Sequence, residues 1–180
     1  MKPNRWEIEN FCYSDECDAI IDLAEIIVGF EQATLNTQTG VATKIEYRNN
    51  KRATFDQPEL AKELWERLKN DSRLLKEGWK AIGLNERFRV YKYSDPKEFF
   101  ALHYDGRFLR TIAFEESWVT ILVYLNDNFE GGETSFHDGD VIPKKGKAAL
   151  MTQGNVLHEA LSVKSGTKYV LRSDVMYRKV

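Results

Sequence analysis

Residues 99–110 read FFALHYDGRFLR, in which His103 and Asp105 are two residues apart. If this stretch contains a strand, the side chains of His103 and Asp105 point to the same face, because positions i and i+2 of a strand do so. A second histidine, His158, follows far along the chain in GNVLHEA. Two imidazoles and one carboxylate form a facial set of ligands that holds Fe(II) and leaves other positions open. The sequence therefore predicts a metal site, and a catalytic centre, at these three residues.

The sequence around His158 extends this pattern. Lys168 lies ten residues later in an alternating run, and VTILVYLND and FEGGETSF lie between the two histidines. Within residues 85–178 these motifs resemble the Fe(II)/2-oxoglutarate-dependent dioxygenases, in particular their prolyl 4-hydroxylase-like branch. The resemblance implies Fe(II), 2-oxoglutarate and O2 as cofactors and co-substrates, with ascorbate as an optional reductant. It implies hydroxylation of a substrate C–H bond with release of succinate and CO2.

The same resemblance implies a cation that binds the far carboxylate of 2-oxoglutarate. Lys168 matches the position of that cation, and alternation places Arg172 on the same strand face as a competitor. Tyr93 lies close to where relatives place a tyrosine that contacts 2-oxoglutarate. Thr120 matches a threonine that can hydrogen-bond the same carboxylate. All four are therefore candidate residues of the 2-oxoglutarate site.

One position departs from the family pattern. Collagen-type enzymes often carry tyrosine at the third residue before the first histidine, where this chain has Phe100. A phenylalanine cannot hydrogen-bond a carboxylate, so Tyr91 or Tyr93 must replace that contact. This difference disfavours a prolyl-peptide substrate and leaves the predicted iron site unchanged.

Basic and amide side chains surround the predicted site in the sequence. Arg107 and Arg110 follow the first two ligands, Arg89 lies in the strand-like ERFRVYKY, and Asn50 and Arg52 belong to the donor-rich EYRNNKRATF. We expect the latter segment to form a lid or wall over the site. A rim of this kind predicts an anionic substrate, such as an amino acid, a peptide or another small molecule.

Length and composition are typical of one folded domain. The chain has 180 residues and a formal net charge of −2, which argues against a general nucleic-acid binder because it lacks a basic excess. Its two cysteines form no disulfide framework. No run is long and apolar enough for a leader or a membrane span. We therefore expect a soluble, cytoplasmic protein with no membrane partner.

Patterning favours a mainly β fold with flanking helices. Ser14 opens a helical pattern that ends at Gly29, and Asp56 and Pro58 open a second one. Short strands separated by turn signals follow. The sequence predicts a double-stranded β-helix (jelly roll, cupin-like). Residues 1–84 are expected to form helical support and a lid, and residues 85–178 the core that carries the metal site.

Two other functions stay open. Arg172 and Arg178 are spaced like an arginine pair of nucleic-acid demethylases in the same superfamily, but Gly106 stands where that branch has asparagine, and the chain is acidic. The other alternative is a non-catalytic, metal-binding jelly roll. His137 lies at a predicted turn and is expected to be a surface residue rather than a ligand. The sequence gives neither the oligomeric state nor the identity of the substrate.

Overall fold

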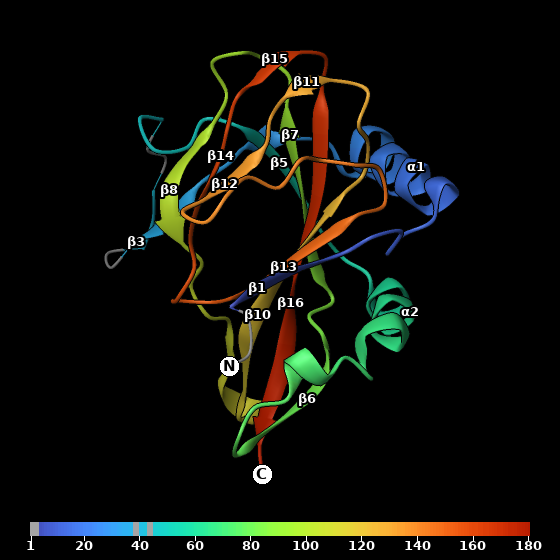
Figure 1. The fold of residues 1–180 in the computed structure, drawn as a ribbon, viewed down its shortest axis with the longest axis vertical. Coiled ribbons are helices and arrows are strands. Elements are labelled where there is room, and N and C mark those ends of the chain that lie inside the picture. Colours follow the sequence, from blue (N-terminus) through green and yellow to red (C-terminus); the bar gives the residue numbers. More distant parts are fainter. Residues whose placement is uncertain (1–3, 38–39, 43–44) are drawn as a thin grey trace.

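The computed structural model describes residues 4–37, 40–42 and 45–180, and its architecture is mainly antiparallel β (Figure 1). Its helical segments are α1 (Ser14–Asp22), the π-helix η1 (Leu23–Val28), α2 (Pro58–Leu68), and the short 3-10 turns η2 (Ser72–Leu74) and η3 (Thr111–Ala113). The strands are β1 (Arg5–Ile8), β2 (Glu31–Gln32), β3 (Leu35–Thr37), β4 (Gly40–Ala42), β5 (Lys51–Asp56), β6 (Trp79–Leu84), β7 (Arg87–Tyr93), β8 (Phe100–Tyr104), β9 (Leu109–Arg110), β10 (Glu115–Tyr124), β11 (Glu130–Gly131), β12 (Thr134–Phe136), β13 (Ala148–Thr152), β14 (Leu157–Ala160), β15 (Val163–Ser165) and β16 (Lys168–Lys179).

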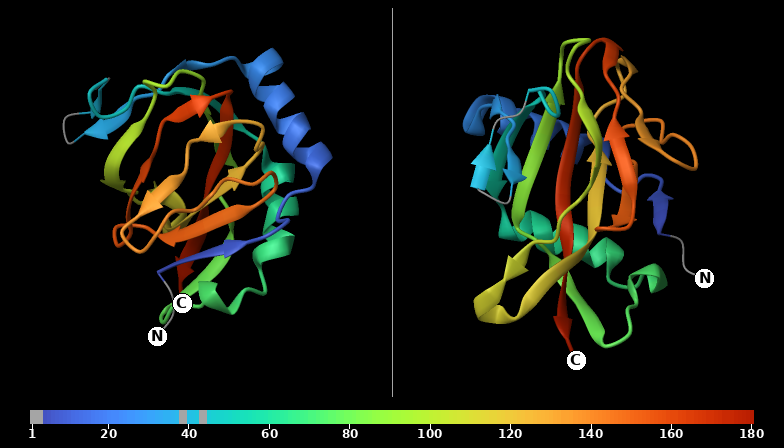
Figure 2. Two further views of the ribbon diagram at one scale, coloured as in Figure 1. Left: turned by 45° about the horizontal axis from the view of Figure 1, so that its top comes forward. Right: turned by 90° about the vertical axis from the view of Figure 1, so that its left-hand side faces the viewer.

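The strands form two facing sheets. The larger sheet has the order β1-β13-β10-β16-β7-β5-β2, with β6 also beside β16 and β9 beside β10. A three-stranded sheet, β12-β14-β8, lies across from it, and β11 pairs with β15 (Figure 2). Their pairings are antiparallel, as expected for a jelly roll. The predicted fold class is therefore confirmed.

The alternation of side chains along the central strands explains how the larger sheet is covered on both faces. On β10, Ile121 and Val123 belong to the core that includes Leu64 of α2, whereas Leu122 and Tyr124 belong to a separate cluster between the sheets. A strand buried on both faces reads as a continuous apolar run, which is the pattern of SWVTILVYL. The helices thus cover the outer face and leave the inner face for the site.

The N-terminal region is less helical than the sequence predicts. β1, β2, β5 and β6 contribute strands from it to the larger sheet. Asp56 does not cap α2, because its carboxylate is ion-paired with Arg87 at 3.0 Å. Ile27 is exposed, because α1 gives way to a π-helix, whose wider turn changes the face on which a side chain lies. No helix in the described part of the chain has both the length and the apolarity to cross a membrane.

Candidate active site

The three predicted ligands come together in the smaller sheet. His103 on β8 and His158 on β14 lie directly opposite each other in the register of the two strands. Asp105 follows the end of β8, where its carbonyl accepts a hydrogen bond from the Gly154 N–H at 3.0 Å. One ligand atom from each of the three side chains lies within 4.8 Å of the others. The strand pairing therefore produces the cluster that the sequence predicts.

The polar atoms of this cluster are arranged to receive a metal ion. The Nδ1 atoms of His103 and His158 lie 2.7 Å and 3.2 Å from the carbonyls of Ala101 and Val156. These contacts favour the tautomer whose Nε2 is free to bind a metal. Oδ2 of Asp105 is buried without a hydrogen-bond partner, 3.7 Å from Nε2 of His158. An unpartnered carboxylate oxygen beside two free imidazole nitrogens fits Fe(II).

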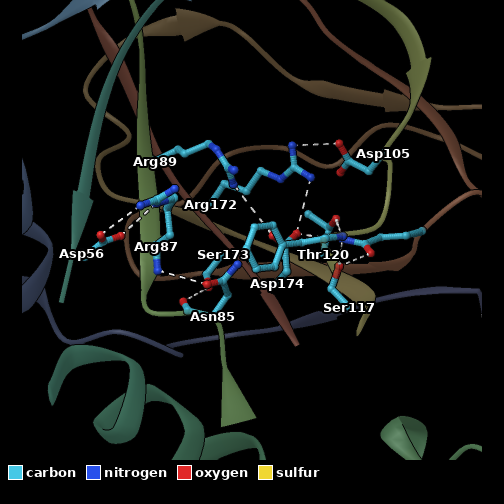
Figure 3. Close-up of polar contacts among 12 residues, drawn as sticks. Asp56, Asn85, Arg87, Arg89, Asp105, Ser117, Thr120, Arg172, Ser173 and Asp174 are labelled. Carbon is cyan, nitrogen blue, oxygen red and sulfur yellow. Dashed lines mark hydrogen bonds and ion pairs between the residues drawn. The ribbon is translucent and has the colours of Figure 1, made fainter. Parts of the chain in front are cut away.

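A buried ionic network that includes Arg172 and Asp174 contacts the Asp105 carboxylate (Figure 3). Arg172 on β16 lies 3.0 Å from Oδ1 of Asp105 and 3.4 Å from Oδ1 of Asp174. Burial would raise the pKa of Asp105, but the Arg172 guanidinium and the two histidines hold it well below its ordinary value. Burial also lowers the pKa of His158. Both shifts favour the protonation states in which these side chains bind a metal.

The three ligand residues line a cavity, and Lys168 lines it as well. Lys168 is 1% exposed, and its Nζ donates a hydrogen bond to the Gly132 carbonyl at 2.5 Å. Burial lowers the pKa of its ammonium to about 7, with Glu133 as a weaker opposing influence. A Cβ atom at Gly132, whose φ is +69°, would lie 3.1 Å from Cδ of Lys168. Glycine in GGETSF therefore both forms the turn and leaves room for the lysine.

Two hydroxyl groups near Lys168 were not among the residues predicted from sequence. Thr134 lines the cavity, and its Oγ1 accepts a hydrogen bond from the Tyr124 hydroxyl at 2.7 Å. Lys168 Nζ also lies 5.7 Å from the centre of the Tyr124 ring and 5.1 Å from that of Tyr93. A buried tyrosine in an otherwise apolar strand is the signal that could have identified this pair.

The structure does not support the predicted contact between Thr120 and 2-oxoglutarate. It does not line the Lys168 cavity, and its Oγ1 accepts a hydrogen bond from Gln153 at 3.1 Å in the network around Asp174 (Figure 3). The register of β10 with β16 pairs Thr120 with Asp174, whereas it pairs Tyr124 with Val170. Thr120 therefore lies at the wrong level along the strand to contact a molecule held by Lys168. The other candidates for that contact, Tyr91, Tyr93 and Arg172, all line the cavity.

An open groove of about 600 Å³ meets the cavity at the ligand cluster, so that His103, Asp105 and Arg172 line both. Of the predicted rim, Arg52, Arg89 and Arg107 line the groove. The remaining groove arginine, Arg48, belongs to the donor-rich segment but was not among the predicted substrate contacts.

Two predicted rim residues lie elsewhere. Arg110 is ion-paired with Glu86 and Glu115, and Asn50 is fully buried and does not line the groove. Arg178, paired with Glu115 at 2.5 Å, does not line the groove with Arg172. His137 is exposed and lies outside the ligand cluster.

Tyr91 lines both the cavity and the groove. Burial would raise the pKa of its phenol, but the guanidiniums of Arg172, Arg48 and Arg89 lower it to about 8. Arg172 also donates a hydrogen bond to the Tyr91 hydroxyl at 3.4 Å. The three guanidiniums therefore favour negative charge at this position beside the ligand cluster.

Comparison with known proteins agrees with this geometry. Residues 88–173, which include all three ligands and Lys168, match the family model of the 2OG-Fe(II) oxygenase superfamily. These residues are similar to the domain of this superfamily. The oxygenase is accordingly an Fe(II)- and 2-oxoglutarate-dependent dioxygenase that uses O2, with His103, Asp105 and His158 as the candidate iron ligands. None of the proteins with curated descriptions matches its sequence.

Solved structures with the same fold include prolyl hydroxylases. The oxygenase is 21% identical to a viral collagen prolyl hydroxylase from Paramecium Bursaria Chlorella virus-1, over 98% of this chain and 97% of that one, with a TM-score of 0.64. A Pseudomonas putida prolyl-4-hydroxylase is 17% identical, over 98% and 93% of the two chains, with a TM-score of 0.67. A prolyl hydroxylase from Trichoplax adhaerens is 18% identical, over 96% and 83%, with a TM-score of 0.69. At these identities the likeness shows the shared fold.

Proposed function

We propose that the oxygenase hydroxylates a C–H bond of a small anionic substrate, either an amino acid or a peptide. The observation that carries this proposal is the position of the ligand cluster, between a cavity that contains a buried lysine and a groove lined with arginines. In such a reaction one atom of O2 enters the C–H bond as a hydroxyl group and the other enters succinate. The first carboxylate of 2-oxoglutarate leaves as CO2.

Lys168 is the proposed partner of the far carboxylate of 2-oxoglutarate. Among the described residues no carboxylate lies within ion-pair distance of its Nζ, so its charge is free for a ligand. Arg172, the competitor, is already paired with Asp105 and Asp174. Tyr93 and Thr134 line the same cavity and can contact the carboxylate beside the lysine. A buried cation without an anion is costly, and the carboxylate would remove that cost.

Each side chain of the cluster then has a defined task. His103, Asp105 and His158 would hold Fe(II), which with 2-oxoglutarate and O2 supplies the oxidising chemistry. Arg172 would keep Asp105 ionised and oriented, because it pairs with the carboxylate oxygen that does not face His158. Tyr91 and Phe100 would close the cavity against the groove, so that the co-substrate and the substrate occupy separate spaces.

The groove supports an anionic substrate, and a peptide remains one of the candidates. The Trichoplax enzyme of the same fold is described in complex with a peptide fragment of a hypoxia inducible factor. Phe100 in place of tyrosine argues against transferring prolyl-peptide specificity to this chain.

The test is anaerobic addition of Fe(II) and 2-oxoglutarate to the purified protein, followed by visible spectroscopy. We expect the weak metal-to-ligand charge-transfer band of a chelated 2-keto acid in the wild type, and a weaker band at equal 2-oxoglutarate in Lys168→Ala. Succinate release on admission of air, measured with candidate anionic substrates, then tests turnover. A protein that binds iron but gives no band would contradict the proposed use of 2-oxoglutarate.

A further inference from the structure

Arg48 is a buried guanidinium at the wall of the groove. Its residue forms an isolated β-bridge with Phe100 just before β5, and it is 4% exposed. The guanidinium carbon lies 4.4 Å from the centre of the Tyr91 ring and 4.2 Å from that of Phe100. Its Nε donates a hydrogen bond to Oδ1 of Asn50 at 2.8 Å. These contacts fix the plane of the guanidinium, and Arg48 lines the groove.

The charge of Arg48 is not neutralised in the described structure. Its NH2 group is buried without a hydrogen-bond partner, and no carboxylate of the described residues lies within ion-pair distance. The other groove arginines are paired: Arg52 with Glu31 at 3.1 Å, Arg89 with Asp174 at 3.8 Å, Arg107 with Glu116 at 3.4 Å, and Arg172 with Asp105 at 3.0 Å. Contact with two aromatic rings offsets only part of the desolvation of a guanidinium.

Arg48 also lies close to a candidate iron ligand. The Phe100 ring against which it packs is stacked on the His103 imidazole, with ring centres 3.6 Å apart and planes at 14°. The Phe100 ring therefore contacts both the Arg48 guanidinium and the His103 imidazole. An anionic group bound by Arg48 would lie in the groove that His103 and Asp105 also line.

We propose that Arg48 binds the carboxylate of the substrate, which is a free amino acid oxidised a few bonds from that carboxylate. Because Asn50 occupies Nε, the carboxylate binds the terminal nitrogens of the guanidinium, one of which has no partner in the described structure. Asn50, whose amide also donates to the Lys51 carbonyl at 2.8 Å, is a positioning residue that sets the orientation of Arg48. This inference rests on the proposed function and narrows its substrate class.

The experiment uses the common L-amino acids, each compared with its own primary amide, in an assay of succinate released above the substrate-free rate. We expect at least one amino acid to stimulate succinate release, and its amide to have a kcat/KM lower by about 100-fold. Dipeptides that carry the same amino acid at their carboxy terminus are assayed in parallel. Stimulation by dipeptides but not by the free amino acid would overturn the assignment to a free amino acid.

Variants of Arg48 separate binding from folding. Arg48→Met is expected to raise the substrate KM by about 100-fold, and Arg48→Lys by about tenfold, because lysine keeps the charge without the planar fork. Arg87→Gln, which removes an exposed ion pair with Asp56 outside the groove, is the matched control and is expected to keep the wild-type KM. The melting temperature of Arg48→Met should not fall, since methionine removes an unpaired buried charge.

The charge-transfer band with 2-oxoglutarate distinguishes the failure of this inference from the failure of the proposed function. If the band forms in all variants but Arg48→Met keeps the wild-type substrate KM, the role of Arg48 is wrong and the oxygenase function stands. If Arg48→Met weakens 2-oxoglutarate binding instead, Arg48 belongs to the co-substrate site. If no amino acid stimulates a protein that forms the band, the substrate class is wrong.

Discussion

The cavity around Lys168 and the groove outside it are both cationic, but their charges are arranged differently. In the cavity a single buried ammonium has one carbonyl contact and no carboxylate partner among the residues described. In the groove four of five arginines are paired with carboxylates of the protein itself. A paired charge is already compensated within the protein, whereas an unpaired buried charge is compensated when a ligand of opposite charge binds. The comparison predicts that specificity depends on Lys168 inside and Arg48 outside.

The largest expected effect is at the junction of the two regions. Asp105→Ala or His158→Ala should lower iron-dependent succinate formation by at least about 100-fold, because the loss of an outer partner of a metal ligand already costs about 10–100-fold. Iron content and succinate release measure this effect. His137→Ala, an exposed histidine, is the control. Loss of activity in a folded His137 variant would mean that a ligand has been assigned wrongly.

Lys168→Met tests the inner region. We expect the dissociation constant of 2-oxoglutarate to rise by about 100-fold, because a desolvated charge pair is lost. The stability without co-substrate should stay the same or rise by about 1–4 kcal/mol, because methionine replaces a buried cation that lacks an anion. Titration of the charge-transfer band and thermal unfolding give the two values. A marked loss of stability would indicate that the lysine is structural.

The affinity for 2-oxoglutarate should depend on pH through the same residue. Burial lowers the pKa of Lys168 to about 7, so the free site loses its charge as the pH rises above that value. A carboxylate binds the charged form, and the affinity should therefore fall by up to about tenfold per pH unit above 7. Lys168→Met should remove this dependence. A wild-type affinity that stays constant from neutral to alkaline pH would argue against Lys168 as the partner.

The smallest effect is expected at the rim of the groove. Arg107 is partly exposed, paired with Glu116 at 3.4 Å and packed over Trp118. Because exposed ion pairs contribute about 0–1 kcal/mol, Arg107→Gln should change the substrate KM by less than about threefold. Comparison of its substrate KM with that of Arg48→Met tests whether an unpaired arginine contributes more to substrate binding than a paired one. Equal changes in KM would show that the two arginines contribute alike.

Sequence periodicity predicted the faces of the strands well. On β7 the alternation places Tyr91 and Tyr93 toward the cavity and Phe88 and Val90 toward the outer core. Thr120 shows where this reasoning ends. Periodicity gives the face of a side chain, but its level along the barrel depends on the register with β16, which pairs Thr120 with Asp174.

The sequence also did not reveal which arginines form ion pairs. Arg110 and Arg48 are both arginines near the site in the sequence pattern. Arg110 is neutralised by Glu86 and Glu115, whereas Arg48 meets Phe100 through a bridge between distant segments. Which arginine keeps a free charge depends on these tertiary contacts, so the residue types of the donor-rich segment could not reveal it.

The pairing of His158 directly opposite His103 has a consequence for how such chains vary. A slip of β14 by one residue would turn His158 to the opposite face of its sheet, because side chains alternate along a strand. Such a chain would keep every residue of the histidine and aspartate motif and would still lack its iron site. Insertions and deletions inside β14 are therefore expected to be far less tolerated than in the turn at Gly154.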